Sequence, residues 1–421
     1  MTADAPGAGA PTAAGQGGGA RLRWFVIGVL VLSTALSFVD RQVLAALAPL
    51  LKDQFHLSNE GYGLVVSAFS LAYAAFAPVA GLFIDRVGLN AGVSVAVGLW
   101  SAAGVATGAA WGLGGLLACR AALGAAESGG IPATAKGFAL YLEPRERAMG
   151  AALNQVGITL GMMAAPLLVG VLATATNWRM AFVATGIAGF LWIPLWLAVA
   201  RRNPPPSRVE PAEGARTLWH DWRLWTLAAA NILMMTVYSL WMNWTTVFLV
   251  SAHGLSPADA NRQFAWVPPV FASVGGLAGG GLSMWWAGRG AGLYSARLRV
   301  CAVSAALLAS TALVPWVGGV RGATALISLS FFAAVAMSSN IYAMPLDLFG
   351  ARPAAFAVSV LTASYGLMQT VASPLYGASI DRYGFGPVCA VCGTLPLAAL
   401  ALLALVGRAS PDRTAPVGGT V

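Results

Sequence analysis

Long apolar stretches separated by short polar junctions run through most of the 421-residue chain. About 20 consecutive apolar residues span the hydrocarbon core of a bilayer as an α-helix. Division of the sequence at its charge clusters and its Gly- and Pro-rich breaks gives twelve such stretches. They are 24–48, 62–84, 91–110, 112–138, 148–174, 179–200, 223–250, 262–287, 297–317, 322–344, 354–380 and 385–407. The pattern therefore predicts an all-α membrane protein with twelve transmembrane helices.

One long polar linker, residues 201–222, interrupts these spans and contains Pro204-Pro205-Pro206. It leaves six spans on either side, in residues 21–200 and 223–407. Many secondary transporters are built from two such halves, with the binding site near the midplane between them. The sequence thus predicts two six-helix bundles joined by a cytoplasmic linker.

The ends of the chain are predicted to be disordered tails. Residues 1–20 are mostly Gly, Ala, Pro and Thr, a composition that cannot bury a core. Residues 408–421 are assigned as a second disordered tail. No cleaved signal peptide is expected, because the first apolar run is long and is better explained as a membrane span.

Composition and charge support a membrane protein and predict its orientation. Of the residues, 58% are hydrophobic and 9% charged, whereas about a quarter are charged in a soluble domain. With the N-terminus inside, 17 Lys and Arg residues fall in cytoplasmic segments and five in outer ones. Because cytoplasmic loops carry an excess of basic residues, both termini are predicted to be cytoplasmic and the membrane to be the inner one. The net charge of +9 then reflects topology, and no basic and aromatic module indicates nucleic-acid binding.

The sequence does not indicate a metal, a disulfide or an enzyme. Cys389-x-x-Cys392 lies in an apolar span without a nearby His or a second Cys pair. This context favours small apolar packing over redox or zinc chemistry. No nucleotide-binding loop, catalytic triad or cofactor motif is found.

Four charged residues lie deep inside predicted spans, away from the span ends: Asp40, Arg41, Arg120 and Glu127. Such a group costs at least about 2.5–3.5 kcal/mol at the helix centre, so it usually faces a water-filled cavity and a partner. Arg120 and Glu127 are seven residues apart, about two helical turns, which places both on one helix face.

These charges have a structural and a functional interpretation. Ion bridges that only fasten one helix to another are a weak device for stability in a low-dielectric interior. In the functional interpretation, Arg41 and Arg120 offer planar guanidinium groups to an anionic substrate. The desolvated carboxylates of Asp40 and Glu127 then bind and release protons near neutral pH.

Gly81-Leu-Phe-Ile-Asp85-Arg86-Val-Gly88, between two predicted spans, resembles the Gly-x-x-x-Asp-Arg-x-Gly signature of the major facilitator superfamily. Within it the chain resembles the anion:cation symporters, and bacterial hexuronate and sugar-acid transporters most. The features that carry this resemblance include Asp40-Arg41-Gln42, Tyr62-Gly63, Ser67-Ala68-Phe69, Ala72-Tyr73, Arg120, Gly124, Glu127, Pro132-Ala133, Lys136, Asn154, Gly157, Gly161, Asn177-Trp178-Arg179, Pro268-Pro269 and Asp347-Leu348-Phe349.

The resemblance implies roles for individual residues. Asp40 and Glu127 are implied in proton coupling, and Arg41, Tyr73 and Arg120 in binding the substrate carboxylate. The residues assigned to a conformational gate are Gly81, Asp85, Arg86, Gly88 and Asp347. The resemblance also implies alternating access and a monomer.

The chain departs from the family pattern in places. The loop signature usually continues into a basic cluster, but here Gly88 precedes Leu-Asn-Ala-Gly. Ile158 stands where some sugar-acid relatives have Gln, so hydroxyl recognition is expected to fall to Asn154 or Gln155. A second copy of the signature, Gly377 to Gly384, lies on the outer face by topology and is interpreted as a helix-end cap or an outer gate contact.

The second half has no charge deep in a span, so neutral polar and aromatic groups are its candidates for binding substrate. They are Tyr238, Asn243, Asn340, Tyr365 and Gln369. A few polar groups among aromatic ones can fix the orientation of a sugar. For each of them, packing at a helix interface is an equally supported alternative.

Together these observations predict a proton-coupled symporter that imports an organic anion, in particular a sugar acid such as a hexuronate or an aldonate. Its expected partners are the small anion, protons and the lipid bilayer. One alternative is a transporter for aromatic or other carboxylates. Another is a transporter-like sensor that binds its ligand without translocating it.

Overall fold

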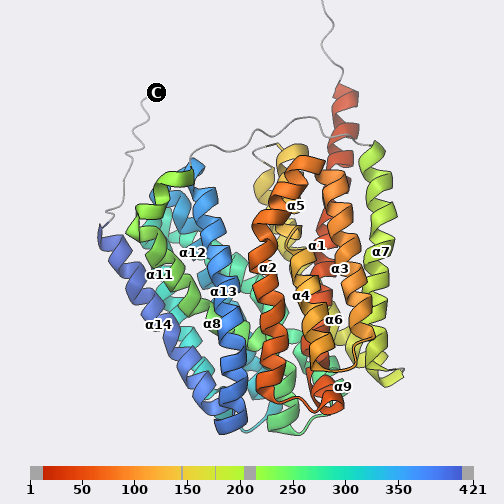
Figure 1. Cartoon of the computed structure of the whole chain (residues 1–421). Coiled ribbons are helices and arrows are strands. Elements are labelled where there is room, and N and C mark those ends of the chain that lie inside the picture. Colours follow the sequence, from red (N-terminus) through yellow and green to blue (C-terminus); the bar gives the residue numbers. More distant parts are fainter. Residues whose placement is uncertain (1–12, 144–145, 176, 203–214, 410–421) are drawn as a thin grey trace, which may run out of the picture.

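The computed structural model describes residues 13–143, 146–175, 177–202 and 215–409, and within them every regular element is helical (Figure 1). The first half of the chain comprises α1 (Ala13–Phe55), α2 (Asn59–Val87), α3 (Leu89–Gly108), α4 (Leu113–Glu127), α5 (Gly130–Tyr141), α6 (Arg147–Ala175) and α7 (Trp178–Arg202). The second half comprises the 3₁₀ helix η1 (Ala215–His220), α8 (Trp222–His253), the short α9 (Pro257–Asp259), the π-helical η2 (Ala260–Ala265), α10 (Val267–Ala287), α11 (Leu293–Leu308), the 3₁₀ helix η3 (Ala309–Trp316), α12 (Val320–Phe349), α13 (Ala351–Tyr383) and α14 (Phe385–Ala409).

The helices form two bundles that stand side by side (Figure 1). In the first bundle, α1 packs against α6, α2 against α4 and α3 against α7. In the second, α8 packs against α14, and α10 and α11 pack against α12. The predicted fold class, an all-α membrane protein with two six-helix halves, is confirmed.

Twelve membrane crossings are formed by these helices. Ten of the described helices, counting adjoining segments as one, have the length and hydropathy of a membrane span. The fourth predicted span is divided at Ser128 and Gly129 into α4 and α5. The eleventh is α13, in which Ser, Thr, Gln and charged residues reduce the hydropathy. The observed helices extend beyond most of the predicted apolar stretches, because a helix continues past the hydrocarbon core of the bilayer.

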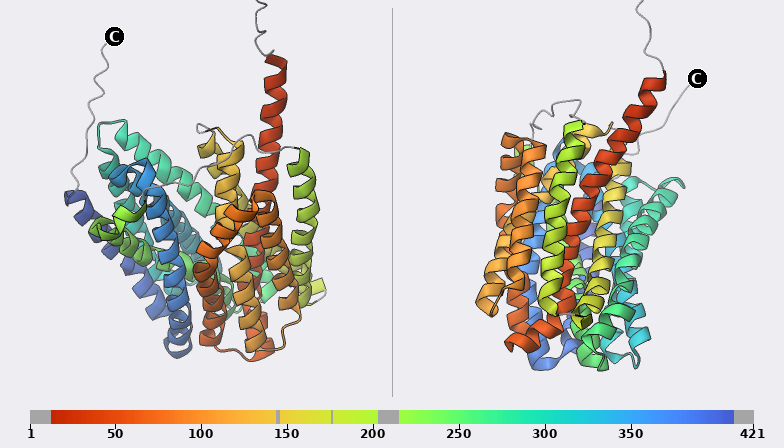
Figure 2. Two further views of the ribbon diagram at one scale, coloured as in Figure 1. Left: turned by 45° about the horizontal axis from the view of Figure 1, so that its top comes forward. Right: turned by 90° about the vertical axis from the view of Figure 1, so that its right-hand side faces the viewer.

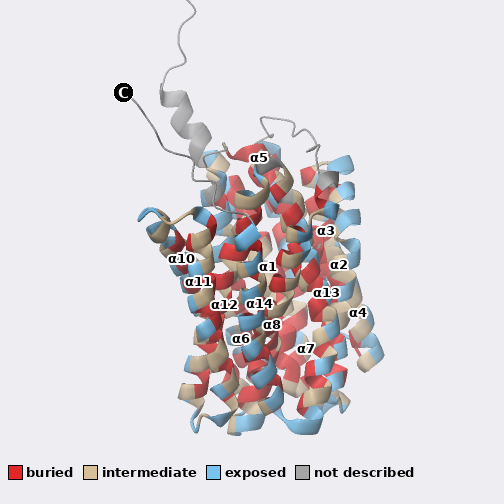
Figure 3. Ribbon diagram, turned by 90° about the vertical axis from the view of Figure 1, so that its left-hand side faces the viewer, coloured by how far each residue is buried: buried red, intermediate tan, exposed pale blue. Residues whose placement is uncertain are grey.

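The outer surface of the bundles is apolar over much of its area. Buried residues line the contacts between helices, whereas exposed residues lie on the outside of the bundles (Figure 3). Leu99, Leu191 and Leu277 are 59%, 67% and 75% exposed. Water-soluble monomers rarely expose large continuous apolar patches. These side chains instead suit contact with lipid, as expected for a multi-pass membrane protein.

The ends of the chain differ in part from the prediction. Helix α1 begins at Ala13, so the structure continues it through residues 13–20, where the sequence predicts disorder. Each residue added to an existing helix gains a backbone hydrogen bond, and this favours such an extension. Residues 1–12 and 410–421 lie outside the described residues.

The predicted linker is described only at its ends. Residues 203–214 lie outside the described part, and η1 leads from the linker into α8. Asp221 caps α8, because its Oδ1 accepts a hydrogen bond from the backbone N–H of Arg223 at 2.9 Å. Hydrogen bonds from the Arg223 guanidinium lower the pKa of the Asp221 carboxyl. This cap fixes the start of the second bundle.

Glycines let several helix pairs approach closely, as small residues often do in membrane proteins. A Cβ atom at Gly124 of α4 would overlap the backbone of Phe69 in α2. Gly157 and Gly161 of α6 both face the backbone of α1. Gly281 of α10 faces open space instead.

The two bundles are joined mainly at the end away from the described termini. Among the described residues, hydrogen bonds join Asn59 and Glu60 to Asp381, Tyr62 to Asn243, Ser67 to Thr370, Ser70 to Gln369 and Asn261 to Ala46. Ion pairs near the terminal end stay within one bundle, as for Lys136 with Asp85 and Arg297 with Asp347. The ribbons of the two bundles diverge toward that end (Figure 2).

Replacing Gly124 by Ala should separate α2 from α4. The added methyl group has no room beside the backbone of Phe69, and overpacking typically costs about 1–3 kcal/mol. We expect the purified variant to melt several degrees below the parent protein in detergent. Gly281→Ala is the matched control and should melt at or above the parent temperature. Equal melting of the two variants would contradict the close contact.

Candidate functional site

An ion pair between α1 and α4 lies at the centre of the first bundle. The Nε of Arg41 donates to Oε2 of Glu127 at 2.5 Å, and the hydroxyl of Ser37 donates to the same oxygen at 2.9 Å. The Glu127 side chain is fully buried, while that of Arg41 is 19% exposed. The second carboxylate oxygen of Glu127, Oε1, is buried and has no hydrogen-bond partner among the described residues. One carboxylate oxygen of Glu127 is thus bonded to Arg41 and Ser37, whereas the other has unused hydrogen-bonding capacity.

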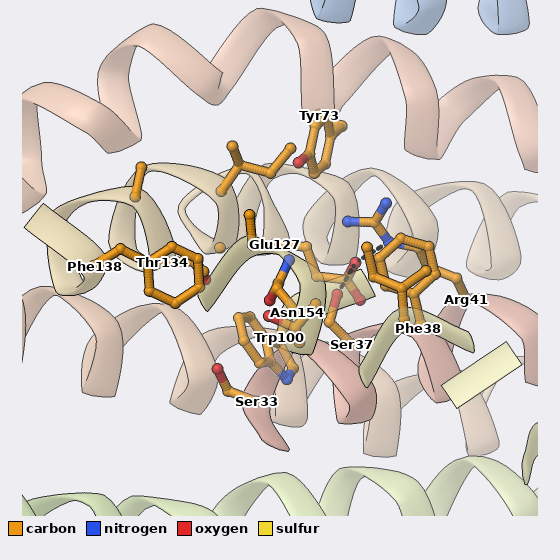
Figure 4. Close-up of a pocket in the computed structure, with 16 residues that line it drawn as sticks. Ser33, Ser37, Phe38, Arg41, Tyr73, Trp100, Glu127, Thr134, Phe138 and Asn154 are labelled. Atoms are coloured by element: carbon orange, nitrogen blue, oxygen red, sulfur yellow. Dashed lines mark hydrogen bonds and ion pairs between the residues drawn. The ribbon is translucent and has the colours of Figure 1, made fainter. Parts of the chain in front are cut away.

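Aromatic rings surround the guanidinium of Arg41. Its central carbon lies 4.8 Å from the ring centroids of Phe38 and Tyr73, and 5.0 Å from that of Phe69. A ring face attracts a guanidinium through its quadrupole. Figure 4 shows Phe38 and Tyr73 beside Arg41, with the dashed contacts running toward Glu127 and Ser37. These contacts fix the orientation of Arg41 between the carboxylate and the cavity.

The second pair of charges, Asp40 and Arg120, is arranged differently. Arg120 is 2% exposed, and its Nη1 is 3.5 Å from the backbone oxygen of Asp40 rather than from the carboxylate. Its guanidinium lies 5.3 Å from the ring of Phe182. Both carboxylate oxygens of Asp40 and two nitrogens of Arg120 are buried without a hydrogen-bond partner among the described residues. Buried groups of this kind call for a partner such as water or a ligand.

The side chains of Asp40 and Arg120 form no direct bond, and this argues against the interpretation that the four charges only fasten one helix to another. If the four charges only fastened α1 to α4, we would expect two complete ion pairs. Among the described residues, only Arg41 and Glu127 form one. The remaining hydrogen-bonding capacity of the cluster is therefore available to a small molecule.

Two cavities meet at Arg41. The larger, about 330 Å³, lies in the first bundle. Its lining residues are Ser33, Thr34, Ser37, Phe38, Arg41, Tyr73, Trp100, Glu127, Gly130, Ile131, Thr134, Ala135, Phe138, Ala151, Asn154 and Ile158 (Figure 4). The smaller, about 110 Å³, lies between the bundles. Its lining residues are Phe38, Arg41, Gln42, Leu44, Val66, Phe69, Arg120, Tyr238, Met242, Asn243, Tyr365 and Gln369.

A third cavity extends the larger one toward α13. It measures about 380 Å³ and shares Tyr73 and Ile131 with the larger cavity. Its far wall contains Ser359, Thr362 and Gly366 of the second bundle. The three cavities are therefore neighbours, since the first two share Arg41 and the first and third share Tyr73 and Ile131.

The structure brings most of the predicted site residues to these cavities. Arg41, Arg120, Tyr238, Asn243, Tyr365 and Gln369 line the cavity between the bundles. Tyr73, Glu127 and Asn154 line the larger cavity with Arg41. Asp40 is buried beside the cluster and lines neither cavity.

Two predicted residues lie away from the cavities. Gln155 is exposed and lines none of them, because it is rotated by one helical position from Asn154. Asn340 is buried inside the second bundle, where its Nδ2 donates to the backbone oxygen of Ala336 at 2.9 Å. The structure therefore does not place either residue with the other candidates.

Several lining residues were not among the sequence candidates. Ser33 and Ser37 precede Arg41 by eight and four positions, so the three lie on one face of α1. This spacing of polar residues in an apolar span is the signal that identifies them. Gln42 is next to the charged pair in sequence, and Thr134 carries no comparable signal.

The predicted gate residues lie at the terminal end of the bundles. Lys136 of α5 donates to Asp85 at 2.8 Å and to the backbone oxygen of Ile84 at 3.0 Å. Lys136 thus supplies the basic partner of Asp85. Gly88 has a φ of 87°, a backbone conformation that favours glycine, and it separates α2 from α3. Arg86 is exposed.

Gly81 and Asp347 complete this set. Gly81 lies beside Pro132 of α5. Asp347 is paired with Arg297 of α11 at 2.5 Å. Among the described residues, the hydrogen bonds and ion pairs of Asp85 and Asp347 stay within one bundle.

Within the described part of the chain, no three His, Cys, Asp or Glu side chains converge on a point. The four cysteines are present as free thiols. The site chemistry is therefore that of guanidinium groups, carboxylates, hydroxyls and amides, which bind anions and exchange protons.

Two membrane-embedded bundles with a charged, cavity-lined site between them are typical of secondary transporters. The chain belongs to the Major Facilitator Superfamily, whose family pattern matches residues 30–361. Members of this superfamily are transporters and not enzymes, so this chain is not an enzyme.

Relatives of known assignment cover most of the chain. The hexuronate transporter of Escherichia coli K12 is 28% identical over 400 residues, which is 89% of this chain and 92% of the relative. The galacturonate transporter of Dickeya chrysanthemi is 30% identical over 285 residues, 62% of this chain and 82% of the relative. The predicted resemblance to sugar-acid transporters of this superfamily is confirmed.

A solved structure shares the fold. A bacterial homologue of the human lysosomal transporter Spinster superposes with a TM-score of 0.73 at 21% identity, covering 92% of this chain and 95% of that one.

Replacing Glu127 by Gln should destabilise the protein, because Arg41 then loses its ionic partner. Removing one member of a buried pair typically costs about 3–5 kcal/mol, whereas replacing both is far less costly. We expect Glu127→Gln to lower the melting temperature, and the double variant Arg41→Gln/Glu127→Gln to recover part of the loss. Strictly additive losses in this double-mutant cycle would show that the two side chains are not coupled.

Proposed function

We propose that the protein is a proton-coupled symporter that imports a sugar acid, such as a hexuronate or an aldonate, by alternating access. The observation that carries this proposal is the pair of Arg41 and Glu127. The Glu127 carboxylate is ion-paired with the guanidinium of Arg41, which lines the cavity. A substrate carboxylate and the Glu127 carboxylate therefore compete for one guanidinium.

The cavity chemistry supports an anion that carries hydroxyl groups. Arg41 and Arg120 line the cavity between the bundles, and guanidinium groups bind carboxylates through paired, charge-assisted hydrogen bonds. Asn243, Gln369 and Tyr365 face the same cavity from the second bundle. Amide and hydroxyl groups among aromatic rings suit the hydroxyls and CH faces of a sugar.

The names of the relatives reduce the range of candidate substrates. Those described above are a hexuronate and a galacturonate transporter. A hexuronate combines one carboxylate with several hydroxyls, which is the combination that the cavity lining offers. Hexuronates are therefore the first substrates to test.

Charge balance in the cluster supports proton coupling. Arg41 and Arg120 offset the carboxylates of Asp40 and Glu127, so the ionised cluster is neutral without substrate. An added anion brings one excess negative charge into a low-dielectric space, which is unfavourable. A proton on Glu127 or Asp40 restores neutrality. When it binds Glu127, it also weakens the hold on Arg41 and frees this side chain for the substrate.

Alternating access is supported by the uneven contact between the bundles. They are joined at the end away from the described termini, and the cavity of about 380 Å³ between α2, α5 and α13 lies toward the other end. Asp85, Arg86, Gly81, Gly88 and Asp347 lie at that other end. We assign them to the contacts that change when it closes.

The basic residues of the loops support an inner-membrane protein with both termini in the cytoplasm. In this orientation the end that joins the bundles is the outer one. Monomeric function is part of the proposal, since each chain contains a complete site. Labelling of the Ser67→Cys variant from one side of the membrane, which also tests the outer contact proposed below, decides the orientation.

Replacing Glu127 by Gln should abolish proton-driven accumulation while sparing exchange. The amide cannot bind and release a proton, so an inward proton gradient no longer drives uptake. The assay is uptake of radiolabelled galacturonate and glucuronate into proteoliposomes, with and without the gradient. Asp53→Asn is the control, since Asp53 is exposed and lines none of the three cavities, so driven uptake should be unchanged.

The same assay separates the alternatives. Normal gradient-driven uptake by Glu127→Gln would rule out its role in coupling. Accumulation of benzoate but of no sugar acid would support an aromatic carboxylate transporter. Binding of a sugar acid without accumulation by the parent protein would support a sensor.

A further inference from the structure

The outer ends of α2 and α13 are joined by a carboxylate that crosses between the bundles. Oδ1 of Asp381 accepts hydrogen bonds from the backbone N–H of Asn59 at 3.0 Å and from its side-chain Nδ2 at 2.7 Å. Oδ2 accepts from the backbone N–H of Glu60 at 2.9 Å. Asn59 is the first residue of α2, and Asp381 lies in the last turn of α13. The second bundle thus caps a helix of the first.

This cap completes the start of α2. The first N–H groups of a helix have no partner within the helix and carry partial positive charge, so they favour a carboxylate. Ser58 supplies one local acceptor, because its side chain accepts from the N–H of Gly61 at 3.0 Å. The N–H groups of Asn59 and Glu60 depend on Asp381.

The surroundings of Asp381 position it for this contact. A Cβ atom at Gly377, one turn earlier in α13, would overlap the backbone of Asn59. The absence of a side chain there lets the two helix ends meet. On the other side, Lys52 donates to the side-chain oxygen of Asn59, which turns the amide nitrogen toward Asp381.

The sequence places the same signature at the opposite ends of this helix pair. Gly377-Ala-Ser-Ile-Asp381-Arg-Tyr-Gly384 ends α13, and Gly81-Leu-Phe-Ile-Asp85-Arg-Val-Gly88 ends α2. The two helices lie side by side and run in opposite directions (Figure 1). Asp85 pairs with Lys136 of its own bundle, whereas Asp381 contacts the other bundle.

We propose that Asp381 is a latch that holds the outer end of the transporter closed by capping α2 across the bundle interface. The latch must open whenever the bundles separate at that end. It rests on the alternating access of the proposed function, but it does not depend on which substrate is carried. An ordinary cap within one bundle would remain intact through that movement.

Ser67 offers a reporter for the opening of this end. It lies in α2 about two helical turns after Asn59. Its hydroxyl donates to the backbone oxygen of Thr370 in α13 at 2.6 Å. Ser67 is half-buried, so a Ser67→Cys thiol would be partly shielded by α13 while the bundles are joined. The reaction rate with a membrane-impermeant maleimide added outside then measures how often the end opens. The native cysteines are half-buried or buried, and their background is measured in the parent protein.

In the Ser67→Cys background, Asp381→Asn should raise the labelling rate about fivefold. This corresponds to the loss of ~1 kcal/mol from the closed state, because the amide keeps one acceptor oxygen but loses the second acceptor and the negative charge at the helix N-terminus. Asn59→Ala removes the Nδ2 contact with Asp381 and the bond from Lys52 but keeps both backbone N–H bonds to Asp381, so it should raise the rate less. Asp53→Asn removes the same charge at the same end and should leave the rate unchanged, because Asp53 is exposed and no hydrogen bond or ion pair joins its side chain to the second bundle among the described residues.

Each outcome decides the proposal. A graded increase from Asn59→Ala to Asp381→Asn, with no effect of Asp53→Asn, supports the latch. An unchanged rate in Asp381→Asn, or an equal increase in Asp53→Asn, overturns it. If labelling behaves as expected and no sugar acid is accumulated, the latch stands and the substrate assignment fails, so the two results are separable.

Discussion

A charged side chain in the interior of a membrane bundle is stable only when an opposite charge, a proton or well-placed hydrogen bonds compensate it. Glu127 meets this condition through Arg41 and Ser37. The compensation is incomplete, since one oxygen of Glu127 and both oxygens of Asp40 have no partner among the described residues. A cluster with unused hydrogen-bonding capacity beside a cavity is suited to exchange partners, and transport of an anion with a proton requires such an exchange.

The rest of the fold holds this cluster in position while leaving the bundles able to move. Glycines such as Gly124 and Gly161 bring helices of the first bundle together, so that α1 and α4 present their charges to one space. Contact between the bundles combines polar contacts, close backbone approaches and a shared apolar cluster. Ligand and proton binding can open this interface only by stabilising the open state more than the closed one.

The positions of the membrane helices could be predicted from the sequence, because charge clusters and hydropathy mark where each crossing ends. The common face of Arg120 and Glu127 was also predictable, since it follows from their spacing on one helix. The choice of partners was not. Adjacent residues Asp40 and Arg41 point in different directions, so Arg41 bonds Glu127 while Arg120 contacts only the backbone of Asp40.

The rotation of each helix also decides which predicted residues of the second bundle line the cavity. Tyr238, Asn243, Tyr365 and Gln369 line the cavity, but Asn340 is turned toward its own helix. A polar residue in an apolar span signals a site or a helix contact with equal strength, and only the rotation of the helix separates the two. The Asp381 contact likewise depends on two helix ends 322 positions apart in sequence.

The central claim is that the anion and a proton enter together through the Glu127 cluster. The most direct measurement is the internal pH of weakly buffered proteoliposomes, prepared without a gradient, after galacturonate is added outside. The account predicts that the interior acidifies as labelled galacturonate enters, and that liposomes without protein show neither change. Entry of galacturonate through the protein at constant internal pH would contradict it.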